Sequence, residues 1–156
     1  MRPNFVLIVA AGLSAAGAAR ADDPAKADLA QLQGTWAVMG REFAGKKASK
    51  EDIDKLKAKI TIKGDAVTVT SLNLDEEVVV SSAKLKLDPT TKPKSMDIWF
   101  TEGPNCGKTV AAIYDLDGDV LKVCIAIGEG DDKRPTQFAG PTKPEWLYIE
   151  YKREKK

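Results

Sequence analysis

The chain has 156 residues, of which 43% are hydrophobic and 30% charged, with 24 basic side chains against 23 acidic ones. This length suits one domain, and the composition is that of a globular protein, which excludes a disordered chain and a multispan membrane protein. The near-zero net charge argues against nucleic acid as a partner, because phosphate binding needs a basic face. The sequence contains no histidine, which excludes mechanisms that depend on an imidazole.

Residues 1–21 have the three parts of a secretory signal peptide. Arg2 supplies the positive start, residues 5–19 form an uncharged apolar run, and Ala19-Arg20-Ala21 has the small-x-small pattern of a cleavage site. The run is shorter than the roughly 20 residues that a spanning helix needs. We therefore expect an exported protein, periplasmic or extracellular, that has no membrane span after cleavage; an uncleaved anchor is the alternative. Residues 22–31 are expected to form a short linker.

Alternation of apolar and polar residues recurs through the rest of the chain, at the period of a half-buried strand. In residues 60–63, for example, isoleucines alternate with Thr61 and Lys63, and two further alternating runs flank Asp117-Gly118, a strong hairpin signal. The pattern predicts an all-β fold of about eight to ten antiparallel strands, arranged as a sandwich or a barrel. One short helix is expected at 49–59, with Ser49 as its N-cap.

The alternation also predicts which side chains face the interior of such a barrel. An eight-stranded barrel lies at the border between a filled core and one that holds a small ligand. The sequence leaves both outcomes open. The predicted interior residues are Val67, Val69, Leu85, Leu87, Met96, Ile98, Val123 and Ile125.

Export would permit a disulfide between the two cysteines. Cys106 lies in a glycine-rich loop pattern, whereas Cys124 lies in a strand pattern whose hairpin partner is near residue 112. Along a straight strand this spacing separates the two cysteines by roughly 20 Å, and a disulfide needs Cα atoms within about 7 Å. The sequence therefore favours a free, buried Cys124 over a bridge.

The opening segment Gln33-Gly34-Thr35-Trp36 resembles the Gly-x-Trp start of lipocalins, and Arg153 stands where lipocalins place an arginine over that tryptophan. More specifically, the chain resembles an uncharacterised lipocalin-like domain family of exported planctomycete proteins. This resemblance implies a lipocalin-like β-barrel domain over residues 32–153, followed by a charged tail at 154–156. It implies no reaction and no cofactor. The shared segments are LQGTW (32–36), LDPTTKPKSMDI (87–98), IYDLDGDVLKVC (113–124), RPTQF (134–138) and YKR (151–153).

A barrel of this kind closes only if its first and last strands pair, which removes both exposed edges. We expect Trp36 near the barrel floor, covered by the guanidinium of Arg153 in a cation–π contact worth about 0.5–2 kcal/mol. The alternative is that Trp36 is an ordinary core residue and Arg153 part of a solvated tail.

Asp115, Asp117 and Asp119 form the best acidic cluster, and carboxylates at alternate positions could offer oxygens to calcium. An EF-hand loop would need glycine after the third acid, whereas Gly118 precedes it. A tight hairpin turn accounts for Asp117-Gly118 without any metal. The sequence therefore predicts no metal site, with these three aspartates as the candidates if there is one.

A second acidic group, Glu129, Asp131 and Asp132, lies in a glycine-rich segment that reads as a solvated loop. Arg134, directly after it, is expected to pair with Asp131 or Asp132. Pro135 fits the first residue of a strand.

Three functions remain open from the sequence. The favoured one is a non-catalytic barrel that binds a small apolar ligand. The second is an interaction module with a filled core that contacts an extracytoplasmic protein through Trp99 or through the loops at 101–109 and 128–134. The third is a carboxylate- or calcium-dependent enzyme, which lacks support because no catalytic motif is present and carboxylates would have to perform all proton transfer.

Overall fold

A computed structural model describes residues 23–73, 75–127, 134–138 and 146–155. The predicted signal peptide and the acidic residues Glu129, Asp131 and Asp132 lie outside the described residues. The described part of the chain forms two short helices and nine strands. These are α1 (Pro24–Leu32), β1 (Gly34–Phe43), β2 (Lys46–Lys47), α2 (Lys50–Leu56), β3 (Lys59–Lys63), β4 (Ala66–Leu72), β5 (Val78–Asp88), β6 (Lys94–Glu102), β7 (Thr109–Asp117), β8 (Val120–Ala126) and β9 (Trp146–Arg153).

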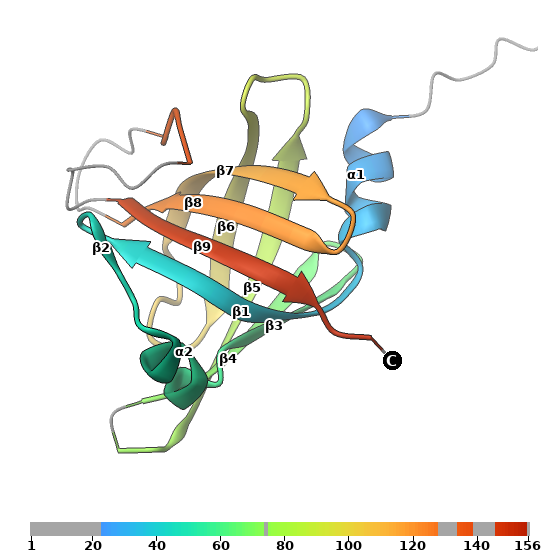
Figure 1. The fold of residues 1–156 in the computed structure, drawn as a ribbon. Coiled ribbons are helices and arrows are strands. Elements are labelled where there is room, and N and C mark those ends of the chain that lie inside the picture. Colours follow the sequence, from blue (N-terminus) through green and yellow to red (C-terminus); the bar gives the residue numbers. More distant parts are fainter. Residues whose placement is uncertain (1–22, 74, 128–133, 139–145, 156) are drawn as a thin grey trace, which may run out of the picture.

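The strands form one antiparallel sheet that closes on itself (Figure 1). Strands β3 to β9 pair in chain order, and β1 pairs with β3 on one side and with β9 on the other. The short β2 is an extra strand that pairs only with the end of β1. The predicted all-β fold, a closed antiparallel barrel, is confirmed.

The interior of the barrel contains the residues that the alternation predicted. Val67, Met96 and Val123 are buried in its main apolar cluster, and the other predicted interior residues pack against this cluster. The turn at Asp117-Gly118 joins β7 to β8, with Gly118 at φ 57°, a conformation that glycine adopts without steric cost. The runs at 78–80 and 85–87 belong to one long strand, β5.

The helices differ from the prediction in number. Residues 22–31 were expected to be a linker, but 24–32 form α1. The Asp23 side chain accepts a hydrogen bond from the Ala25 amide, and Pro24 occupies the first turn. Both features favour the start of a helix. The helix expected at 49–59 is the shorter α2, capped by Ser49 as predicted and without a buried side chain.

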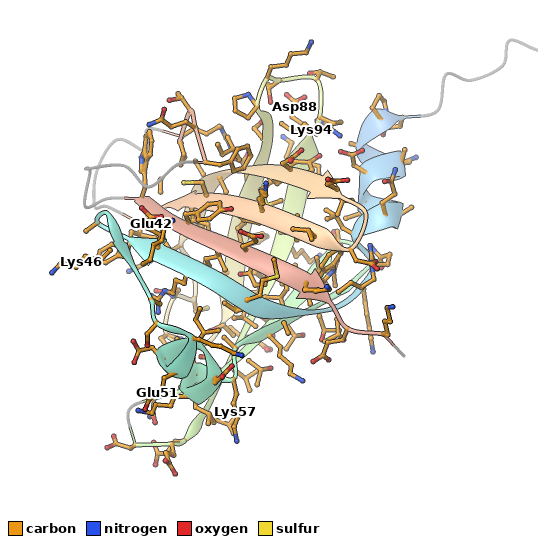
Figure 2. The ribbon with its side chains drawn as sticks, in the orientation of Figure 1. Glu42, Lys46, Glu51, Lys57, Asp88 and Lys94 are labelled. Atoms are coloured by element: carbon orange, nitrogen blue, oxygen red, sulfur yellow. The ribbon has the colours of Figure 1, made fainter. Side chains whose placement is uncertain are left out.

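The two helices mark opposite ends of the barrel. Helix α1 lies at the end that includes the β5–β6 connection, where Figure 2 shows Asp88 and Lys94. Helix α2 and the β1–β2 turn lie toward the other end, where Figure 2 shows Lys46 and Lys57. We call these the closed end and the open end, for the reasons given below.

A second apolar cluster lies on the outer face of β7, β8 and β9. Ile113, Cys124 and Trp146 are buried there, and Phe138 packs against them. Residues 134–138 form no strand, contrary to the strand start expected at Pro135; this proline is instead fully buried.

Arg134 lies beside this cluster, and the two aspartates expected to pair with it lie outside the described residues. Its guanidinium donates to the carbonyls of Met96 and Ala112, each at 2.7 Å, and to the Asp97 carboxylate at 2.6 Å. These contacts attach the segment to β6 and β7.

Candidate ligand-binding cavity

The closed end is built around Trp36, which is fully buried. Its cross-strand partner is Arg153, whose guanidinium lies 4.1 Å from the centroid of the Trp36 ring. Arg153 also donates to the carbonyls of Gln33 at 2.5 Å and Gln31 at 2.7 Å, and its Nε lies 3.1 Å from Asp119. The structure thus brings together the two residues expected to close the barrel.

Helix α1 covers this end because its last carbonyls have partners in the barrel. A helix leaves its final carbonyl groups without partners inside the helix. The Trp36 indole nitrogen donates to the Leu32 carbonyl at 2.9 Å, and Arg153 binds the carbonyls on either side of it. Leu32 itself is fully buried in the main apolar cluster. The Gln33 side chain completes the attachment through the N–H and the C=O of Gly64.

A second attachment of α1 involves Asp28. Its carboxylate accepts a hydrogen bond from the Tyr114 hydroxyl at 2.7 Å and lies 2.8 Å from the Lys94 ammonium. Burial, reinforced by the Asp28 carboxylate, raises the pKa of Tyr114 well above its usual range. The phenol therefore stays protonated and keeps donating to Asp28.

Above this floor the barrel encloses a cavity of about 310 Å³. Such a volume lies at the lower limit of small-molecule sites, which are concave and mostly apolar. The lining is predominantly apolar, with three uncharged polar side chains toward the open end, Ser71, Ser81 and Asn105. The apolar lining residues are Leu32, Ile60, Ile62, Val67, Val69, Val79, Leu85, Met96, Ile98, Phe100, Pro104, Leu121, Val123, Ile125 and Ile149, together with the ring of Tyr151.

The β6–β7 loop forms part of the cavity mouth and is held by its own backbone. The Gly107 amide donates to the Phe100 carbonyl at 2.9 Å, and the Lys108 amide donates to the Asn105 carbonyl at 3.0 Å. Gly103, at φ +92°, sits so close to β5 that an added Cβ would lie 2.6 Å from Ser81 Oγ and 2.8 Å from the Val80 carbonyl oxygen. Glycine at this position therefore lets the loop pack directly on β5.

We expect Gly103→Ala to lower the free energy of unfolding by about 2–3 kcal/mol, through backbone strain together with this clash. Gly107→Ala is the matched control: its φ is similarly positive, +85°, but nothing lies within 4 Å of the added Cβ. It should cost about 1 kcal/mol. Urea unfolding of both variants measures the difference, and equal losses would show that the loop does not press on β5.

The predicted acidic candidates do not come together as a cation site. Asp119 is engaged by Arg153, and Asp115 pairs across the strands with Lys122. No group of three or more Cys, Asp or Glu residues within the described ranges is placed to hold a metal ion.

The two cysteines are both free. Cys106 is exposed in the β6–β7 loop. Cys124 is buried in the second apolar cluster, on the outer face of the barrel, where burial raises its pKa to about 11. A thiol reacts as the thiolate, so at neutral pH Cys124 should be inert.

We therefore expect one thiol per chain to react with a thiol-specific reagent in the folded, unreduced protein and two in urea. Cys106→Ser should leave none reactive until the chain unfolds. A denatured, unreduced protein with no reactive thiol would instead reveal a disulfide.

Trp99 lies on the outer face of β6, opposite Lys84, and is 53% exposed. It does not contribute to the cavity. The loop at 101–109 that was considered with it as a contact surface lies beside the cavity mouth, and residues 128–133 are outside the described part of the structure.

No family model, curated protein or solved structure matches this chain. Among the described residues, neither helix is long and apolar enough to cross a bilayer.

Sequence reasoning missed the residues that attach α1, namely Asp28, Gln33, Lys94 and Tyr114. A signal for the helix was present: an acidic N-cap, a proline at its first position, and apolar residues at Leu29 and Leu32, three apart. No comparable signal marks the polar side chains of the mouth, because their meeting depends on how the strands are aligned.

Proposed function

We propose that the protein is an exported, non-catalytic, lipocalin-like barrel that binds a small apolar ligand in its interior. The observation that carries this proposal is the apolar cavity of about 310 Å³. A filled core would have left no such space, because protein interiors normally contain few voids larger than a water molecule. The mouth supplies neutral polar groups that can orient a ligand without excluding an apolar one.

The test compares two neighbouring valines near the start of β5, Val79 and Val80. Val79 lines the cavity near its open end, whereas Val78 and Val80 are 64% and 50% exposed. A glutamate at position 79 would place a carboxylate among apolar groups, where an uncharged ligand cannot compensate for its desolvation. Val80→Glu adds the same charge on the outer face of the same strand.

The probe is naphthylamine, a small uncharged dye whose fluorescence increases in apolar surroundings. We expect saturable binding at one site, weakened about tenfold or more by Val79→Glu and changed less than about twofold by Val80→Glu. Circular dichroism of both variants verifies their fold. Absence of dye binding would contradict the proposal, and binding that survives Val79→Glu but is lost in Trp99→Ala would favour the outer face as the interaction surface.

Export is tested separately. Expression of the full chain in a bacterial host should give a mature protein in the exported fraction whose first residue is Asp22. An intact N-terminus in the membrane fraction would show an uncleaved anchor instead.

A further inference from the structure

Strand β1 contains an irregularity that changes which of its side chains face the cavity. Its pairing with β9 shifts between Val38 and Gly40, so that Met39 is an extra residue. Such a bulge puts two residues of one strand opposite one residue of its neighbour. Beyond the bulge, Arg41 pairs with Ile149, which lines the cavity. Because directly paired residues share one face of a sheet, Arg41 lies on the interior face, toward the open end.

A charged residue at this position is an exception in the barrel. Apart from Arg153 and Lys94, which both bind α1 at the closed end, the interior positions of the described barrel strands are apolar or uncharged. Within the described residues, the Arg41 guanidinium forms no ion pair and no hydrogen bond. Arg41 is exposed, so its charge stays hydrated while the cavity is empty of ligand.

Tyr151 supplies a second polar group to the same space. It is buried and lines the cavity, and in the described part of the chain its hydroxyl has no hydrogen-bond partner. Among the described residues, every side-chain nitrogen or oxygen that is fully enclosed has a hydrogen-bond partner. Because the Tyr151 hydroxyl has none, it is not fully enclosed and reaches the open space of the cavity. Burial raises the pKa of Tyr151, and the positive charge of Arg41 acts on it in the opposite direction, so the guanidinium lies within electrostatic range of this hydroxyl.

The volume limits the size of the ligand. An apolar cavity of about 150 Å³ holds benzene, and this cavity has about twice that volume, 310 Å³. It therefore suits a molecule of about a dozen non-hydrogen atoms.

We propose that the ligand is a medium-chain carboxylic acid whose apolar tail occupies the cavity and whose carboxylate is bound by Arg41, with the Tyr151 hydroxyl as a second donor. This inference rests on the proposed ligand-binding function and adds the charge of the headgroup to it. An arginine binds a carboxylate through charge-assisted hydrogen bonds, which are about twice as strong as those between neutral groups.

Calorimetric titration with decanoate, below its micelle-forming concentration, and with decanol, its uncharged analogue, tests the inference. The wild-type protein should bind decanoate at least about tenfold more tightly than decanol. Arg41→Gln should weaken decanoate binding about ten- to hundredfold and change decanol binding less than about twofold. Tyr151→Phe, which removes only the hydroxyl, should weaken decanoate binding by a smaller factor of about two to ten.

Lys84→Gln is the matched control, because it removes one positive charge from the exposed outer face of β5. It should leave both affinities unchanged. Equal affinity for decanoate and decanol, or an Arg41→Gln variant that binds decanoate as the wild type does, would overturn the headgroup assignment while apolar binding stands. If neither decanol nor naphthylamine binds, the proposed function itself fails.

Discussion

Replacing Arg153 by alanine should lower the free energy of unfolding by roughly 2–4 kcal/mol. The variant loses the contact with the Trp36 ring, worth about 0.5–2 kcal/mol. It also leaves the carbonyls of Gln31 and Gln33 without their donors, and each hydrogen bond from a charged group contributes about 1.5–3 kcal/mol. These contributions share one side chain and are not additive, so the expected loss is smaller than their sum.

Urea unfolding followed by tryptophan fluorescence measures this loss. Lys152→Ala is the matched control, since it removes a long cation from the neighbouring, exposed position of β9; its effect should stay within about 0.5 kcal/mol. Arg153→Lys should be intermediate, because lysine keeps the charge but not the planar donor set. A loss below about 1 kcal/mol in Arg153→Ala would show that the closed end does not depend on this residue.

Replacing Leu32 by alanine should cost about 2–5 kcal/mol, the usual range for truncating a fully buried leucine. Leu32 is completely buried and lines the bottom of the cavity, so its removal enlarges an existing space instead of allowing the surroundings to collapse. We expect the loss in the upper half of that range. Lys26→Ala, on the exposed side of the same helix, should change stability by less than about 0.5 kcal/mol.

The Leu32 variant has a second readout, because a larger cavity should accept a larger ligand. Naphthylamine binding should be retained in Leu32→Ala, and acids longer than decanoate should gain affinity relative to decanoate. A stability loss accompanied by complete loss of dye binding would instead indicate that α1 has detached from the barrel.

The strands, and the side chains of each strand that point into the barrel, were predictable because burial of one face of a strand imposes a period of two. The hairpin at Asp117-Gly118 fixed the pairing of β7 with β8, and the interior positions of both strands followed from it. The contact between Trp36 and Arg153 was expected from the resemblance and from the need to pair the first strand with the last. The hydrogen bonds from Arg153 to the end of α1 were not expected, because the residues of this helix were taken for a linker.

Neither the cavity nor the position of Arg41 on the interior face was predictable from the chain. Whether a barrel is filled depends on the small difference between the space enclosed by the sheet and the volume of many side chains. The face of β1 on which Arg41 lies depends on the extra residue Met39. A shift of one residue moves every later side chain of the strand to the other face. Alternation alone does not show where such a bulge occurs.

We expect a small apolar molecule to bind inside the barrel. Nuclear magnetic resonance of isotope-labelled protein titrated with naphthylamine tests this claim most directly. We predict that the signals of the inward-facing Val69, Val123 and Ile125 shift in a saturable manner, while those of the outward-facing Thr68 and Cys124 change little. Shifts confined to the outer face around Trp99, or no saturable shifts at all, would contradict the claim.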